Sequence, residues 1–306
     1  MSRGRGEAAM VPRAEPASYY GRPVVKPPVW SGEVAWYLFA GGLAGASAVL
    51  GTAADAAGNR PLARRAWLLA LAGITVSPAL LVSDLGRPER FLKMMRVFKV
   101  TSPMSMGSWI LAASGGATSV ATAHELFGWF GRLGPLAKVA STALGPALAT
   151  YTGVLVADTA VPAWHEARRE LPFVFAGGAM ASAGAASLAL TPRSHAGPAR
   201  RLTLGGAALE LAAAEAMARR LGGVAEAYRT GRAGRFARAS RALTAAGAAV
   251  VGAAGRRSRA LAVAGGAAVL AGAASERWAV FEAGKASAAD PKYTVGPQRE
   301  RLATSG

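Results

Sequence analysis

Five polar residues at the ends of long apolar segments could move protons or hydrogen-bond a ligand. They are Glu33, Asp84, Arg87, Tyr151 and Asp158. Tyr151 and Asp158 are seven residues apart, which puts them on one face of a helix, about two turns from each other. Ionisable groups at membrane depth are costly and are therefore candidates for function. We expect Asp158 and Tyr151 to act as catalytic proton-transfer groups, and Glu33, Asp84 and Arg87 to shape the same pocket.

Each of these residues also has a purely structural interpretation. Asp84 and Arg87 can pair across a helix end, and Glu33 can be a first-turn carboxylate at the positive end of a helix. Tyr151 can be a packed aromatic side chain. Asp158 is the hardest to explain in this way, because it interrupts an apolar run and more apolar residues follow it.

The apolar segments that must position these residues are long enough to cross a membrane. The chain of 306 residues is 52% hydrophobic and 17% charged, with a mean hydropathy of +0.26. A helix that spans a bilayer needs about 20 apolar residues. The sequence therefore predicts an all-α integral membrane protein with about eight transmembrane helices. The predicted spans are Val34–Ala54, Ala66–Ser83, Met104–Phe127, Val139–Pro162, Pro172–Leu190, Leu202–Ala218, Ala242–Gly255 and Ala260–Ala274.

These spans are expected to form two four-helix bundles flanked by polar segments. Residues 1–30 are a cytoplasmic segment without the apolar core of a signal peptide. Residues 31–165 form the first bundle with the candidate site, and residues 166–277 form a second bundle rich in Ala, Gly and Arg. Residues 278–306 are a polar cytoplasmic tail, expected to be extended after Trp278. Of the 35 Lys and Arg residues, 24 fall on the side of the two termini, which favours a cytoplasmic position for both.

The segment between the second and third spans has an apolar and a basic side. Its apolar stripe has helical spacing and consists of Phe91, Met94, Met95 and Phe98. Basic residues recur every third position beside this stripe, and include Arg90, Lys93 and Arg96. This pattern predicts an amphipathic helix in the membrane interface, whose basic side could dock a partner. Ser102 and Pro103 then predict the N-cap and the first residue of the next helix.

The composition excludes several kinds of site. The chain has no cysteine, so it cannot carry a cysteine-ligated iron–sulfur cluster, a c-type haem or a disulfide. Its three histidines do not lie at depth on facing helices, which argues against haem, and no metal-site spacing is present. The net charge of +18 comes from basic residues in short loops, a pattern that indicates membrane-lipid contacts rather than nucleic-acid binding.

One stretch also resembles a known family. Asp84–Trp109 reads DLGRPERFLKMMRVFKVTSPMSMGSW and is similar to the D-L-G-R-P-x-R-F and S-P-M-S-x-G-S-W signature of the NrfD/polysulfide-reductase membrane-subunit family. Similar segments are GEVAWYLFAGGLAGASA from Gly32, YTGVLVADTAVPAWHEAR from Tyr151 and ELPFVFAGGAMASAGA from Glu170. The resemblance covers most of residues 30–190 and weakens from residue 193 to residue 277.

The resemblance implies an inner-membrane, multi-pass subunit of a respiratory oxidoreductase that binds quinone or quinol, either menaquinone or ubiquinone. Its partners would be a four-cluster, ferredoxin-like iron–sulfur subunit and a molybdopterin-type catalytic subunit. Asp158 and Tyr151 would then serve the quinone headgroup. Two alternatives stay open, namely a transporter or proton-conducting protein, and a passive membrane anchor without quinone chemistry.

Overall fold

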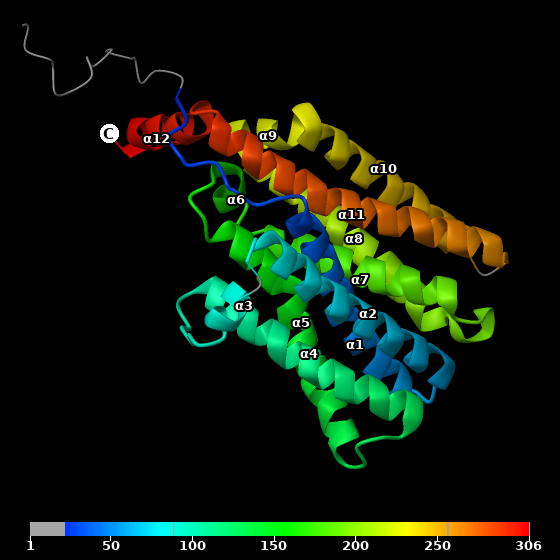
Figure 1. Ribbon diagram of the computed structural model, residues 1–306. Coiled ribbons are helices and arrows are strands. Elements are labelled where there is room, and N and C mark those ends of the chain that lie inside the picture. The colour runs from blue at the N-terminus through cyan, green and yellow to red at the C-terminus, as the bar shows by residue number, and fades with distance from the viewer. Residues whose placement is uncertain (1–21, 88, 256, 306) are drawn as a thin grey trace, which may run out of the picture.

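Long helices joined by short segments form the body of the protein (Figure 1). The computed structural model describes residues 22–87, 89–255 and 257–305, and these residues form helices and no strands, which confirms the all-α prediction. The long helices are α1 (Glu33–Ala56), α2 (Arg60–Asp84), α4 (Pro103–Phe127), α5 (Leu133–Ala157), α7 (Leu171–Leu190), α8 (Gly197–Arg220), α10 (Gly231–Ala253) and α11 (Arg259–Ala289). The shorter helices are α3 (Glu89–Met94), α6 (Pro162–Glu166), α9 (Glu226–Arg229) and α12 (Lys292–Ser305), with 3₁₀ helices η1 (Arg193–His195) and η2 (Gly222–Ala225).

Successive long helices run in opposite directions, so the chain returns to the same end after every second helix. The end where α1 begins also holds α3, α6, α9 and α12 (Figure 1). We call this end the N-terminal end and the opposite end the far end. All of the sequence-predicted site residues lie at or near the N-terminal end.

Local sequence signals define several helix boundaries. The Ser102 hydroxyl accepts a hydrogen bond from the Ser105 amide at 3.4 Å, and Pro103 begins α4, which confirms the predicted cap. At the start of α2 the Asn59 side chain accepts from the Leu62 amide at 3.3 Å. Gly128 caps the C-terminus of α4, and its φ of 72° lies in the left-handed region that glycine adopts easily.

The helices pack in two groups that meet at α7. Helices α1, α2, α4 and α5 contact one another, as do α7, α8, α10 and α11. Helix α7 also packs against α1 and α5, and α11 touches α1. The first group comes from the first half of the chain and the second group from the second half, in the order of the two predicted bundles. The division of the bundles after residue 165 stays a prediction.

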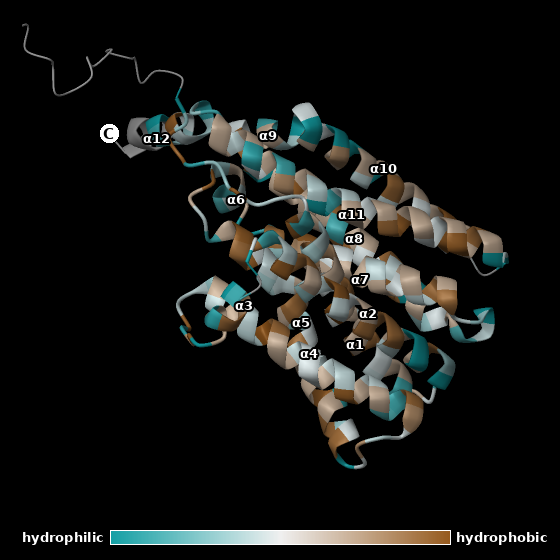
Figure 2. Cartoon of the chain, in the orientation of Figure 1, coloured by the Kyte–Doolittle hydropathy of each residue, from teal (hydrophilic) through white to brown (hydrophobic). Residues whose placement is uncertain are grey.

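Four of the long helices are long and apolar enough to cross a membrane, namely α1, α2, α5 and α7. Apolar residues dominate along these helices, whereas hydrophilic residues gather toward the helix ends (Figure 2). The remaining four predicted spans overlap α4, α8, α10 and α11, which have the length of a span, but the spans predicted for α10 and α11 cover only part of these helices. Their passage through a membrane stays a prediction.

The structure corrects the C-terminal part of the predicted architecture. The chain is not extended after Trp278, because α11 continues to Ala289 and α12 follows. Apolar residues hold this continuation in the core, since Val280 and Phe281 are buried and the Val280 carbonyl accepts a hydrogen bond from Trp164 Nε1 at 2.6 Å. The predicted N-terminal segment lies mostly outside the described residues, which begin at Arg22.

The predicted interfacial helix is shorter than its sequence pattern. Helix α3 ends at Met94, so Met95 and Phe98 lie beyond it. The hydroxyl of Ser105 donates to the Val97 carbonyl at 2.7 Å and accepts from the Lys99 amide at 3.0 Å. These bonds hold residues 97–99 in a loop, because the same backbone groups cannot also form a helical ladder.

Close contact between glycines sets the spacing of α1 and α5. A Cβ atom added at Gly145 would lie 2.6 Å from the Gly45 carbonyl oxygen and 2.9 Å from Cγ2 of Val49. Because the nearest obstacle is backbone, the two helices would have to separate. Gly45 and Gly41 form a Gly-x-x-x-Gly pair in α1, a spacing that allows helices to pack closely, and Gly41 faces the Ser77 hydroxyl of α2.

We expect Gly145→Ala to lower the free energy of unfolding by about 1–3 kcal/mol through overpacking. The control is Gly205→Ala in α8, where an added Cβ meets no atom within 4 Å and the gain in helix propensity should make the change neutral or stabilising. Thermal unfolding in detergent measures both variants. Equal stability of the two would contradict the close packing of α1 on α5.

Candidate functional site

A small pocket lies between α1, α2, α4 and α5 at the N-terminal end. Its volume is about 70 Å³. Its polar lining residues are Tyr37, Asp84, Ser108 and Tyr151. The rest of the lining is apolar, and includes the Trp30 ring and the two methionines Met94 and Met104. Polar groups that converge in an apolar cavity are typical of a small-molecule site.

Asp84 joins the end of α2 to the beginning of α1. Its Oδ1 atom accepts a hydrogen bond from the Ser31 amide at 2.9 Å and a second from the Ser31 hydroxyl. A carboxylate at the end of α2 is thereby placed beside the first turn of α1, where the helix dipole favours negative charge. Among the described residues no ion pair joins Asp84 to Arg87, whose side chain is exposed. The structure therefore contradicts the structural interpretation in which Asp84 and Arg87 pair across a helix end.

Tyr151 reaches the pocket because α4 has a glycine opposite it. A Cβ added at Gly107 would lie 2.8 Å from Cζ of Tyr151 and 3.0 Å from its hydroxyl, and closer still to Cε2. The tyrosine ring thus occupies the volume that any other side chain at position 107 would need. Tyr151 and Asp84 are the two sequence-predicted site residues that line the pocket.

Tyr37 is a pocket residue that sequence reasoning missed. It is 1% exposed, and its hydroxyl has no hydrogen-bond partner among the described residues. A buried hydroxyl without a partner is unfavourable, so a ligand oxygen in the pocket would satisfy it. The available signal was a tyrosine one turn after Glu33 in the first span.

The other predicted site residues lie outside the lining. Glu33 is exposed at the first turn of α1. Asp158 is also exposed, and it caps the C-terminus of α5 rather than lying within the helix. Its amide donates to the Val154 carbonyl at 2.9 Å, which closes the last turn, and the chain then turns toward Pro162. The predicted span ended at Pro162 and was too long by five residues, so the depth assigned to Asp158 is corrected.

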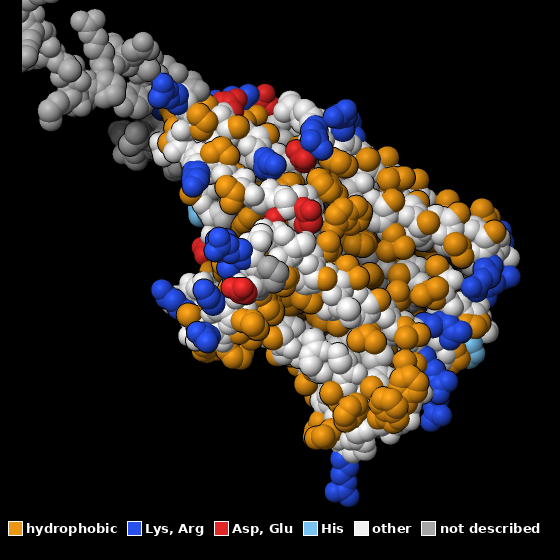
Figure 3. Space-filling view, in the orientation of Figure 1, with side chains coloured by type: hydrophobic (Ala, Val, Ile, Leu, Met, Phe, Trp, Pro, Cys, Tyr) orange, Lys and Arg blue, Asp and Glu red, His pale blue; other side chains and the backbone are white. Residues whose placement is uncertain are grey.

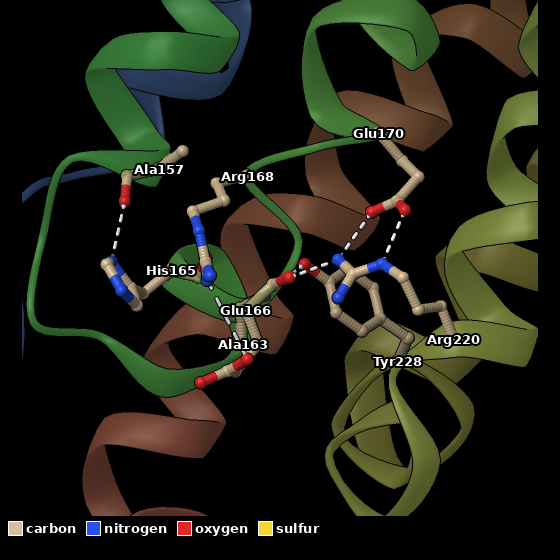
Figure 4. Close-up of polar contacts among 8 residues, drawn as sticks. All are labelled: Ala157, Ala163, His165, Glu166, Arg168, Glu170, Arg220 and Tyr228. Carbon is tan, nitrogen blue, oxygen red and sulfur yellow. Dashed lines mark hydrogen bonds and ion pairs between the residues drawn. The ribbon is translucent and has the colours of Figure 1, made fainter.

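The segment after Asp158 is tied to the second group of helices (Figure 4). The Tyr228 hydroxyl donates to the Ala163 carbonyl at 3.0 Å. Arg220 donates to both Glu170 carboxylate oxygens, at 2.5 and 2.6 Å, and to the Glu166 carbonyl. Burial raises the pKa of Tyr228 above its usual range, so its hydroxyl stays a donor at neutral pH. These contacts hold the segment between α5 and α7 against α8 and α9.

Trp164 in α6 links the same segment to the pocket. It is 1% exposed and stacks on the pocket residue Trp30, with ring centroids 5.4 Å apart and an interplanar angle of 22°. A glycine in α11, Gly284, makes room for the Trp164 ring. Helix α11 therefore supports the pocket through Trp164 and Trp30.

A larger cleft of about 460 Å³ lies beside α12 and η2 at the same end. Its charged lining residues pair within the protein, because Arg220 binds Glu170 and Lys292 lies 3.0 Å from Glu226. The contact with Glu226 raises the pKa of Lys292. Among the described lining residues of the cleft, no buried hydroxyl lacks a hydrogen-bond partner. The cleft differs in this respect from the pocket, where the Tyr37 hydroxyl has none.

The basic side of α3 is exposed near the pocket. Arg90, Lys93 and Arg96 all have exposed side chains. Figure 3 shows Lys and Arg side chains gathered at the two ends of the helices, with hydrophobic side chains covering much of the surface between them. This distribution is typical of a protein whose helix ends meet lipid headgroups.

A comparison with protein-family models matches residues 23–203 to the family described as "Polysulphide reductase, NrfD". The matched region is more than half of the chain and contains every residue of the pocket lining. No curated protein shows significant similarity to the chain.

Proposed function

The chain belongs to the polysulphide reductase NrfD family of respiratory membrane subunits, and from this premise we propose that its pocket binds the headgroup of a quinone or quinol. It is a multi-pass membrane protein. The observation that carries the proposal is the pair of tyrosines, Tyr37 and Tyr151, in an otherwise mostly apolar pocket beside Asp84. Quinone carbonyls accept hydrogen bonds, and tyrosine hydroxyls can donate them.

The lining residues fit the chemistry of a quinone headgroup. The pocket must enlarge before a headgroup can enter. A cavity of about 150 Å³ takes a benzene-sized ring, whereas the pocket has about 70 Å³. Two lining residues, Met94 and Met104, have flexible side chains that can change rotamer, and Met104 is 50% exposed. We infer that the two methionines turn outward when a headgroup enters.

In the proposed site Tyr37 and Tyr151 would hold the headgroup by hydrogen bonds, and Asp84 would anchor the pocket wall. A quinone supplies two-electron chemistry that takes up two protons when bound. The hydroxyls of Tyr37 and Tyr151 would donate hydrogen bonds to its oxygens, and the surrounding apolar side chains would exclude water. Asp158 and Glu33, exposed at the same end, remain candidates for proton exchange with solvent, and their roles stay predictions.

The partners follow from the family and from the position of the pocket. An iron–sulfur subunit with four clusters must bring an electron donor close to the pocket, and the exposed basic residues Arg90, Lys93 and Arg96 are the proposed contact. A molybdopterin-type subunit would complete the complex. Both termini are proposed to lie in the cytoplasm, since basic residues favour that side.

Titration of purified protein with a fluorescent quinol-site inhibitor tests the pocket. We expect Tyr37→Phe and Tyr151→Phe each to weaken binding about two- to tenfold, the effect of one lost hydrogen bond. Asp158→Asn is the comparison variant and should bind like the wild type. Stronger weakening by Asp158→Asn than by either tyrosine variant would move the site to the end of α5. A folded protein without saturable binding would favour a passive anchor or a transporter.

A further inference from the structure

Three charged side chains are buried in the second group of helices, away from the pocket. They are Glu210 in α8 and the neighbours Glu276 and Arg277 in α11, which are 1%, 4% and 1% exposed. All three lie outside the part of the chain that matches the family. Burying charged groups at this depth is costly unless they are paired or neutralised.

Helix α7 provides the space in which the acid and the guanidinium meet. A Cβ atom added at Gly178 would lie 2.5 Å from Oε1 of Glu210 and 2.9 Å from Nη2 of Arg277. At Gly177 it would lie 2.8 Å from Cα of Glu210. The two adjacent glycines therefore admit both side chains to the surface of α7.

Arg277 is bound mainly to α7 and only loosely to the acid. Its Nη2 atom donates to the Phe175 carbonyl at 2.9 Å, and its guanidinium carbon lies 4.1 Å from the centre of the Phe175 ring. The distance from Nη1 to Oε1 of Glu210 is 3.9 Å, which is longer than a hydrogen bond.

Glu210 lacks the partners that an ionised carboxylate needs. Neither of its oxygens has a hydrogen-bond partner among the described residues. The charged groups that face it are Arg277 and the like-charged Glu276. Glu276 has its own neighbours on α10, Ser240 and Arg241. The nearest cation to Glu210 is thus shared with a second carboxyl group and held by the Phe175 carbonyl.

We propose that Glu210 is a proton-binding site inside the second group of helices and that Arg277 is its counter-ion. In the observed geometry Glu210 is a neutral carboxylic acid and Arg277 rests on Phe175. When the O–H bond of Glu210 breaks, the proton passes to a water molecule, and Arg277 moves from the Phe175 carbonyl to the new carboxylate. The site stores one exchangeable proton, and it acts separately from ligand binding at the pocket.

Infrared spectroscopy of the full-length protein tests this site through the carbonyl stretch of a protonated carboxylic acid. At neutral pH we expect the wild type to show this band, the band to shift in heavy water, and Glu210→Gln to lose it completely. Glu215→Gln is the matched control, because Glu215 lies on the same helix, is exposed and pairs with Arg219 at the surface. That variant should keep the band.

The proposal is overturned if the wild type has no such band, if Glu210→Gln keeps it, or if Glu276→Gln abolishes it instead. Circular dichroism shows whether each variant is folded. Should Glu210→Gln fail to fold, wild-type protein containing isotope-labelled glutamate carboxyl groups gives a second readout. The band must then shift with the label and persist in both Glu276→Gln and Glu215→Gln.

Discussion

Gly107→Ala should weaken ligand binding at the pocket by about tenfold or more. The added methyl group would occupy the volume of the Tyr151 ring, which lies 2.8 Å from the Cβ position at Cζ. The ring must move, and its hydroxyl moves with it. A displacement of about 1 Å in a positioned group can cost as much as a hundredfold in function. Inhibitor titration of the purified protein measures the change.

Gly116→Ala is the control for this prediction. Gly116 lies in the same helix, α4, and an added Cβ there meets no atom within 4 Å. This variant should bind like the wild type and unfold at the same or a higher temperature. If Gly107→Ala is folded and binds normally, Tyr151 does not need its observed position, and the proposed role of its hydroxyl is wrong.

Trp164→Ala should be the most destabilising single change considered, at about 3–5 kcal/mol for a buried tryptophan. The variant removes a fully enclosed ring, the stack on Trp30 and the hydrogen bond to the Val280 carbonyl. Because Trp30 lines the pocket, binding should weaken as well. Thermal unfolding in detergent and inhibitor titration give the two readouts.

An exposed tryptophan at the far end supplies the comparison for Trp164. Trp129 is 60% exposed and contacts Phe127, so Trp129→Ala should change stability by about 0.5 kcal/mol or less. Equal loss in the two variants would show that the contacts of α6 with α11 do not stabilise the fold. If Trp164→Ala lowers the stability but leaves inhibitor binding unchanged, Trp164 does not support the pocket.

The sequence was sufficient to predict the order of the long helices but not all of their lengths, because α10 begins eleven residues before the predicted span and α11 ends fifteen residues after it. Apolar runs and local caps are encoded within a few residues, as at Ser102 and Pro103, whose roles the structure confirms. The end of α5 was harder, because apolar residues continue past Asp158 to Pro162. Hydropathy alone does not distinguish a helix from the apolar turn that follows it, and this error assigned too much depth to Asp158.

Contacts between distant residues explain what sequence reasoning missed. Arg277 resembles a residue beyond the end of a span, because the predicted span ends at Ala274. Its partners are the carbonyl and the ring of Phe175, more than a hundred residues earlier. Tyr37 likewise resembles an ordinary aromatic residue of an apolar helix, and only the packing of four helices reveals its unpartnered hydroxyl.

The pocket is built from an early and continuous part of the chain, with consequences for synthesis at the ribosome. Its lining residues run from Trp30 to Val156, so all of them are available for insertion when about half of the protein has been made. Glu210 follows much later, and Arg277 follows last of all. The predicted insertion of α8 would therefore bring Glu210 to the bilayer before its counter-ion exists, and the uncharged acid would enter at a lower cost than the carboxylate.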